Sequence, residues 1–293
     1  MKVLRMQGFM RKLCGRPVER SDPYGQAWRL GTIVCFLLYF SGVYGIHRLF
    51  EEHIRRRQRR VVLTYHRVRD DSLDSHISVT PKTFDRQLRY LTQRFTLTSV
   101  NALLAPPDQV ENGRKSFVAL TFDDGYLDNF EQAFPLLKKY AVPATIFLVS
   151  RWLGKTMFMS RHHIMEMLEH GIEFGSHTLT HPVLSSINSD QAKDEIEGSK
   201  KDLERMLRRA VRFFAYPKGK HQDVNPDIIR GVAAAGYEAA FMAENGAIRG
   251  DESPYELKRI GIRECPMIVF KLRLSGLLET KPFFLIRQAF GLT

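Results

Sequence analysis

Cysteine is scarce in this chain of 293 residues, which has only Cys14, Cys35 and Cys265. Three cysteines that are scattered and odd in number exclude a disulfide scaffold and a cysteine-rich zinc site. Proline is also sparse, with 13 residues, whereas 44% of the residues are apolar and 26% are charged. This composition excludes a disordered or collagen-like protein and predicts a sizeable core. A bound metal would therefore need histidine and carboxylate ligands.

An excess of charge of one sign is missing from most of the chain, although the formal net charge is +12. Residues 1–60 contain 13 Lys or Arg against 4 Asp or Glu, whereas residues 61–293 contain 31 against 28. The nearly balanced body argues against a nucleic-acid partner, because duplex binding needs a basic groove. The basic N-terminal arm, residues 1–29, and the basic linker, residues 51–60, favour membrane lipid as a partner of the N-terminal segment.

Long uncharged runs are also rare, and the most apolar one extends from Leu30 to Ile46. A bilayer is spanned by roughly 20 apolar residues, and this run has 17. We expect residues 30–50 to form a single membrane helix, with an interfacial helix and a buried core helix as alternatives. The expected location is therefore an inner or plasma membrane. Lys and Arg residues are too evenly divided around the run to indicate which side the rest of the chain faces.

Short apolar stretches alternate with helical patterns after residue 60. Strict alternation of this kind predicts an α/β protein with a parallel sheet or barrel covered by helices. We expect one catalytic domain, residues 61–265, followed by a C-terminal helical extension, residues 266–293. The expected strands are Val61–Tyr65, Phe117–Phe122, Ala144–Val149, Ile172–Gly175, Arg212–Tyr216, Tyr237–Phe241 and Ile260–Ile262.

Capping residues mark where the main helices begin. We expect helix N-termini at Thr80, at Asn188 or Ser189, and at Asn225, because these side chains can accept hydrogen bonds from the first helical turn. Pro135 interrupts the next helical pattern and predicts a turn or kink there.

Two motifs rich in Asp and His follow predicted strands. Asp123 and Asp124 are adjacent carboxylates, which repel each other unless a cation or a proton relay uses them; an Asp-Asp-Gly turn is the alternative. His177 and His181 are spaced to lie on the same side of one helical turn, although such pairs also occur by chance. Both motifs would lie at the carboxyl edge of the sheet, where barrel enzymes assemble their sites. Two His and one Asp would form a zinc-type ligand set.

Two further segments end at the same expected edge. Tyr216, Pro217, Lys218 and Gly219 follow a predicted strand, and a Pro and a Gly around an exposed backbone amide suit an oxyanion donor. A plain turn is the alternative. His66 closes the first strand; a lone histidine there is more often structural, but four strand ends with such groups favour one shared site.

The combination Thr-Phe-Asp-Asp-Gly, His-Thr-x-x-His and aromatic-Pro-x-Gly resembles the polysaccharide deacetylase family with NodB homology. The resemblance implies an irregular (β/α) barrel and a metal-dependent hydrolase that removes N-acetyl groups from an amino-sugar polysaccharide or glycan. It implies that Asp123 is the catalytic base and that Asp124, His177 and His181 bind one divalent metal ion, usually zinc. The backbone amide of Lys218 would then contribute to the oxyanion hole.

The sequence departs from this family pattern in two places. The family often has an Arg that tethers the base two residues before the motif's proline, where this chain has Ala215. It often supplies a late Trp and an acid His, yet neither residue type occurs after His221. Some family members instead carry a His at the end of the first strand, and His66 is therefore the candidate general acid.

Cleavage of an N-acetyl amide needs an activated water, a polarised carbonyl and a proton for the leaving nitrogen. The expected products are acetate and a free amino sugar. One alternative is a non-catalytic glycan-binding barrel anchored at the membrane, which does not explain Asp123, because metal binding alone does not require it. Another is a lipid-anchored scaffold, which leaves both motifs unexplained.

Overall fold

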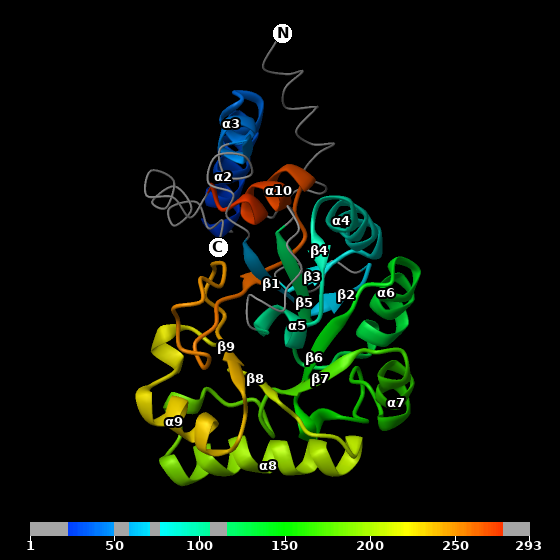
Figure 1. Cartoon of the computed structure of the whole chain (residues 1–293), viewed down its shortest axis with the longest axis vertical. Coiled ribbons are helices and arrows are strands. Elements are labelled where there is room, and N and C mark those ends of the chain that lie inside the picture. The colour runs from blue at the N-terminus through cyan, green and yellow to red at the C-terminus, as the bar shows by residue number, and fades with distance from the viewer. Residues whose placement is uncertain (1–22, 50–58, 71–76, 106–115, 278–293) are drawn as a thin grey trace. The chain divides into compact units, whose positions relative to one another are not determined.

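The computed structural model describes residues 23–49, 59–70, 77–105 and 116–277 (Figure 1). Residues 58–264 form one compact unit, and residues 1–57 together with 265–293 form a second. Each unit is described by itself. The basic linker, apart from residues 59 and 60, the first 22 residues of the basic arm and the last 16 residues of the C-terminal extension lie outside the described residues.

The larger unit is built on a curled parallel sheet. Its strands are β1 Arg60–Tyr65, β4 Thr96–Leu97, β5 Phe117–Phe122, β6 Ala144–Leu148, β7 Glu173–Ser176, β8 Phe213–Ala215, β9 Ala239–Phe241 and β10 Ile260–Gly261. The strand order is β10-β1-β5-β6-β7-β8-β9, and β4 also pairs with β5. The central strand β5 is buried along its whole length, as expected where both faces of a parallel sheet are covered. Two short strands, β2 Arg67–Val68 and β3 Ser78–Val79, pair separately.

The segment 254–260 connects the two edges of this sheet. The backbone N–H of Met242 donates to the carbonyl of Leu257 at 2.8 Å, and the N–H of Leu257 donates to Ala240 at 3.0 Å, which continues the pairing beyond β9. Ile260 then pairs with Leu63 of β1. The strands themselves therefore form a half-barrel, and the segment 254–260 closes the gap between its two edges. This arrangement agrees with the expected (β/α) fold.

Most of the helices lie around the outside of the curled sheet, whereas α5 Val100–Leu104 contributes to its buried interior (Figure 1). The other helices of this unit are α4 Pro81–Arg94, α6 Phe134–Tyr140, α7 Arg161–Glu169, α8 Ser189–Leu207 and α9 Pro226–Ala234, with the short turns η4 Ser150–Trp152, η5 Leu184–Ser186 and η6 His221–Asp223. The side chains of Thr80, Asn188 and Asn225 accept hydrogen bonds of 2.9–3.1 Å from backbone N–H groups three residues on. The helix starts expected from these capping residues are therefore confirmed.

The segment around Pro135 contains a π-helical turn, η3 Asn129–Ala133, which passes directly into α6. The missing N–H of proline is tolerated in the first turn of a helix, so Pro135 marks a junction between two helical geometries. Such π-turns occur frequently at functional sites, and this one follows the Asp123-Asp124 motif.

The interior of the half-barrel is filled by apolar side chains from its strands, from α5 and from the segments that contain Ile248 and Leu257. Burial of such side chains stabilises the fold by about 25 cal/mol per Å² of apolar surface. The main buried cluster comprises Val62, Val100, Leu103, Phe117, Ala119, Phe147, Phe213, Ala215, Ala239, Phe241, Ile248 and Leu257. These residues hold the strands in register and so fix the positions of the side chains at the strand ends.

The smaller unit contains α2 Pro23–Phe40, α3 Val43–Leu49 and α10 Met267–Ser275. Here α10 packs against α2, and the carbonyl of Ser275 lies 3.2 Å from Nε2 of His47. The apolar run from Leu30 to Ile46 is divided at Gly42, whose φ of 83° interrupts the helix. Within the described residues, no helix is long and apolar enough to cross a membrane. The single membrane helix expected over residues 30–50 is thus not borne out.

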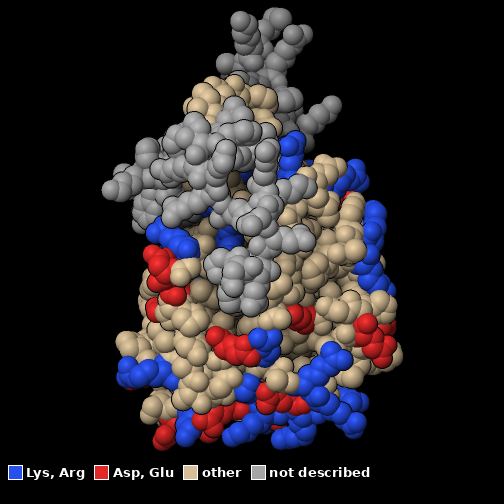
Figure 2. Space-filling view, in the orientation of Figure 1, with Lys and Arg blue, Asp and Glu red and all other residues tan. Residues whose placement is uncertain are grey.

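Charged residues of both signs are mixed over the larger unit on the face shown in Figure 2. On α8, Glu197 lies 3.9 Å from Lys193 and 3.3 Å from Lys201, and Glu204 lies 2.9 Å from Lys200. These pairs are four residues apart, the spacing at which side chains meet on a helix surface. The mixture agrees with the nearly balanced charge of residues 61–293.

Candidate metal and catalytic site

Asp124, His177 and His181 come together at the carboxyl ends of β5 and β7. Their ligand atoms all lie within 4.8 Å of one another. Oδ1 of Asp124 is 3.6 Å from Nε2 of His177 and 3.5 Å from Nε2 of His181. This oxygen is buried and makes no hydrogen bond within the described part of the chain. A buried carboxylate oxygen facing two imidazole nitrogens fits a divalent cation, because an unsatisfied buried charge is otherwise costly.

The ring of His177 is oriented by a backbone carbonyl. Its Nδ1 lies 2.7 Å from the carbonyl oxygen of Ala215. Because a carbonyl only accepts, Nδ1 carries the proton and the lone pair of Nε2 faces Asp124, an arrangement typical of metal-binding histidines. Burial, together with the neighbouring His177, lowers the pKa of His181 to about 4. His181 is therefore neutral near pH 7, as a metal ligand must be.

The segment between the two histidines is a loop and not the expected helical turn. Thr178 and His181 both have left-handed backbone conformations, with φ of 69° and 68°. The carboxylate of Glu195, on α8, accepts hydrogen bonds of 2.8 and 2.9 Å from the N–H groups of Leu179 and Thr180. The expectation of a helix is wrong because these side-chain contacts replace helical hydrogen bonds. The loop nevertheless brings both imidazoles to the same side.

Asp123 forms a buried ion pair that the sequence did not predict. Nη1 and Nη2 of Arg259 donate to the two oxygens of Asp123 at 2.8 Å each, and Nε donates to the carbonyl of Met242 at 3.1 Å. Burial alone would raise the pKa of Asp123, but the guanidinium of Arg259 holds it below its usual range. Arg259 thus supplies the tether that is missing at Ala215. No local pattern in the sequence marks this role, because Arg259 follows Lys258 directly and precedes β10.

His66 lies on β1's carboxyl side, beside Asp123. Its Nε2 is 4.0 Å from Oδ2 of Asp123, and its side chain is 32% exposed. The side-chain amide of Asn129 donates to the backbone carbonyl of His66 at 2.8 Å. Asp128 accepts from Nε of the adjacent Arg67 at 2.9 Å. The residues that begin the π-helical turn therefore fix the backbone around His66, while its imidazole remains accessible.

The segment from Tyr216 to Gly219 turns sharply after β8. Tyr216 and Pro217 are buried, whereas Lys218 is exposed. Lys218 has a φ of 59°, and its backbone N–H makes no hydrogen bond within the described residues. Gly219 also has a positive φ, and a Cβ there would lie 2.8 Å from the backbone nitrogen of Ala243. The structure therefore leaves one backbone donor available in this segment, that of Lys218.

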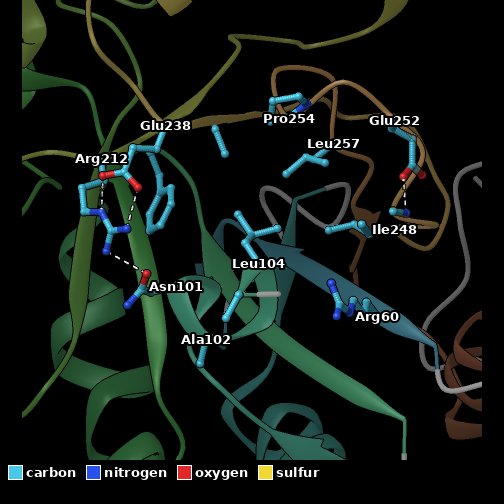
Figure 3. Close-up of a pocket in the computed structure, with 14 residues that line it drawn as sticks. Arg60, Asn101, Ala102, Leu104, Arg212, Glu238, Ile248, Glu252, Pro254 and Leu257 are labelled. Carbon is cyan, nitrogen blue, oxygen red and sulfur yellow. Dashed lines mark hydrogen bonds and ion pairs between the residues drawn. The ribbon is translucent and has the colours of Figure 1, made fainter. Parts of the chain in front are cut away.

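A separate cavity of about 570 Å³ lies at the opposite end of the sheet (Figure 3). It is lined by the first residues of three strands, including Arg60 and Phe213. Beside it, Arg212 donates to both carboxylate oxygens of Glu238 and to Asn101. None of the Asp or His residues of the candidate site lines this cavity. The amino-terminal end of such a sheet usually serves stability.

Comparison with known proteins agrees with this geometry. A family model for polysaccharide deacetylase matches residues 110–240. YxkH of Bacillus subtilis strain 168, a candidate polysaccharide deacetylase, is 31% identical over 203 residues, which cover 69% of this chain and 70% of that protein. The chain belongs to the polysaccharide deacetylase family. It is therefore a hydrolase of the kind that acts on the amide bond of N-acetyl groups.

Other polysaccharide deacetylases resemble this one in sequence and in structure. A poly-β-1,6-N-acetyl-D-glucosamine N-deacetylase of Staphylococcus epidermidis is 28% identical, over 68% of this chain and 78% of that protein. The deacetylase PplD of Streptococcus pyogenes, solved in complex with acetate, has a TM-score of 0.66 and 26% identity, and the match covers 73% of this chain and 97% of that one. BC0361, a polysaccharide deacetylase from Bacillus cereus, has a TM-score of 0.65 and 26% identity, covering 74% of this chain and 69% of that one.

The ion pair between Asp123 and Arg259 gives the first prediction. Arg259→Met leaves a buried carboxylate without a partner, which should lower the free energy of unfolding by about 3–5 kcal/mol. Replacing both residues, as in Asp123→Asn with Arg259→Met, should recover most of this loss because no uncompensated charge remains. Urea unfolding of the four proteins measures the coupling. Losses that simply add would show that the pair is not coupled.

Glu195 gives the second prediction. Glu195→Ala removes the acceptor that holds the loop between the two histidines, and the affinity for Zn²⁺ should fall about 10-fold, as for other groups that support metal ligands. Glu197→Ala is the matched control, because Glu197 lies on the same helix and pairs with Lys193 and Lys201 at the surface. Zn²⁺ titration by calorimetry compares the two variants. Equal affinities would mean that Glu195 does not position the ligands.

Proposed function

We propose that this polysaccharide deacetylase uses one divalent cation to remove N-acetyl groups from an amino-sugar polysaccharide. The observation that carries the proposal is the meeting of the Asp124, His177 and His181 ligand atoms beside Asp123, which is paired with Arg259. Two imidazole nitrogens and one carboxylate oxygen suit Zn²⁺, with room for a further ligand. The name of the Staphylococcus epidermidis relative supports N-acetylglucosamine as the sugar.

The role of Asp123 follows from its charged partners. Arg259 and His66 keep its carboxylate ionised, so it can accept a proton from an attacking water. A carboxylate with a lowered pKa is a weak base, and it cannot deprotonate an ordinary water efficiently. A cation held by Asp124, His177 and His181 would polarise the acetyl carbonyl and lower the pKa of a water to about 7. The weak base and the cation ligands therefore form one catalytic unit.

Two other groups complete the reaction. The free backbone N–H of Lys218 would donate to the oxygen that becomes negatively charged when water adds to the acetyl carbon. His66, protonated, would donate to the amide nitrogen as the carbon–nitrogen bond breaks. The water oxygen ends in acetate, and the nitrogen leaves as a free amine. His66 is suited to this step because its ring is accessible and lies beside Asp123.

The third prediction tests the function and the division of roles between the adjacent aspartates. The Zn²⁺-loaded chain should release acetate from β-linked N-acetylglucosamine oligomers, and a chelator should abolish the release. Asp123→Asn should retain Zn²⁺ but lose turnover by several orders of magnitude, because the base is gone. Asp124→Asn should lose Zn²⁺ itself, because a ligand is gone.

Acetate release and metal analysis give the outcome of this test. A Zn²⁺-loaded protein that binds the oligomers without releasing acetate would replace the proposal by a glycan-binding role. Equal loss of Zn²⁺ in both variants would contradict the division of roles. His162→Ala is a suitable control, because His162 is exposed on α7 and does not belong to the cluster.

The fourth prediction concerns His66. His66→Ala should lower turnover of the amide by about 10²–10⁴-fold with unchanged Zn²⁺ content, since general-acid help typically contributes that much. The loss should be smaller for an aryl acetate ester, because its leaving oxygen departs as a stable anion and needs no proton. Steady-state kinetics on both substrates decides the matter. A purely structural His66 would reduce both activities alike.

A further inference from the structure

A row of three aromatic side chains extends from the candidate metal site. The ring of Trp152 lies 5.3 Å from that of His181, and its other neighbour, Phe158, lies 4.8 Å away. Phe158 stacks on Tyr126 at 5.1 Å, and the guanidinium of Arg67 lies 4.5 Å from the Tyr126 ring. We call Trp152, Phe158 and Tyr126 the aromatic row. It connects a metal ligand with the strand that follows His66.

The backbone holds the aromatic row in place independently of its rings. Tyr126 and Phe158 form an antiparallel bridge. On either side of it, the N–H of Leu127 donates to Met157 at 2.7 Å, and the N–H of Met159 donates to Gly125 at 3.0 Å. Two loops at the carboxyl edge of the sheet, after β5 and after β6, are thereby joined. Aromatic side chains on such a fixed frame lose little conformational entropy when they bind a ligand.

The aromatic row is accessible, unlike the aromatic residues of the core. All three of its side chains are half-buried, and Met157, between them in the loop, is 49% exposed. The indole N–H of Trp152 makes no hydrogen bond within the described residues. It is not one of the buried polar atoms without a partner. The row therefore offers apolar ring surface and a free donor beside the site.

Such a surface matches one class of ligand. A β-linked glucosamine unit has its ring substituents in equatorial positions, so each face of the sugar presents mainly C–H groups. These apolar faces pack on aromatic rings, while the hydroxyl and acetamido groups at the rim form hydrogen bonds. Because the row borders the candidate site from His181 to Tyr126, it suits a unit next to the one that is deacetylated.

We propose that the aromatic row binds a neighbouring sugar unit of a β-linked N-acetylglucosamine chain and so makes the enzyme selective for oligomers over single sugars. This inference rests on the proposed function for its substrate class. It assigns Trp152 and Phe158 to substrate binding, and not to the chemical step. The occupant is one further sugar unit of the same chain, held by stacking and by the indole N–H.

The fifth prediction tests this selectivity by kinetics. In Phe158→Leu and Trp152→Leu, the ratio of kcat/KM for the β-linked tetramer to that for N-acetylglucosamine should fall about 5–10-fold, since one lost stacking contact is worth about 1 kcal/mol. Trp152→Phe should retain most of the ratio. Phe95→Leu is the matched control, a half-buried aromatic that packs on Tyr90 at the end of α4. Zn²⁺ content is measured in every variant.

The result that would overturn the inference is an unchanged ratio. Loss of Zn²⁺ in Trp152→Leu, with equal loss of activity on tetramer and single sugar, would likewise overturn it, because Trp152 would then only support His181. Phe158 has no ring contact with His181 among those of the described residues, so Phe158→Leu separates these two roles.

Fluorescence tests the same inference without catalysis. The chain has two tryptophans, so Trp28→Phe leaves Trp152 as the only one. Titration of this full-length variant with the tetramer should change the Trp152 emission at concentrations at which N-acetylglucosamine does not. Acetate release without this change in emission would overturn the binding role of the aromatic row and leave the proposed function intact. A change in Trp152 emission without acetate release would support the binding role of the aromatic row and contradict the proposed function.

Discussion

The buried ion pair between Asp123 and Arg259 links the candidate site to the closure of the sheet. Asp123 follows the central strand β5, whereas Arg259 belongs to the segment that joins the two edges of the sheet. Arg259 packs beside Phe147 and Phe241, with its guanidinium 5.4 and 6.0 Å from the centres of their rings. Charges in such surroundings are costly unless every polar group is satisfied. The two-oxygen pairing and the Met242 carbonyl provide this, so Asp123 can be both buried and ionised.

Backbone strain is concentrated at the same edge of the sheet. Asp124, Thr178, His181 and Lys218 are all non-glycine residues with left-handed conformations. Each such residue costs on the order of 1–3 kcal/mol unless its surroundings enforce it. The enforcing contacts are local, as in the hydrogen bond of 2.9 Å from the His181 N–H to the Thr178 hydroxyl. The packed interior therefore supports a strained rim, which carries the Asp and His side chains of the site and the segment of Lys218.

Local signals in the sequence predicted most of the framework. The strand Phe117–Phe122 and the caps Thr80 and Asn225 could be predicted because apolar patterns and capping are properties of neighbouring residues. The roles of Glu195 and Arg259 were missed because each depends on a residue far away in the chain, which no local pattern shows. The prediction for the apolar run around Gly42 failed for a different reason, because it was based on composition alone. Its composition suggested one membrane helix, but a single left-handed residue divides it.

The two adjacent aspartates have identical side chains but different surroundings. Both are buried at the end of β5, so their intrinsic chemistry is the same. Both oxygens of Asp123 accept from Arg259, which leaves it charged but satisfied. Oδ1 of Asp124 has no hydrogen-bond donor within the described residues and faces the Nε2 atoms of two histidines. A carboxylate with both oxygens paired can stay ionised while buried, whereas a buried oxygen that faces two imidazole nitrogens without a donor fits a divalent cation. The partners, and not the residue type, therefore distinguish the two aspartates and support the different roles that we propose for them.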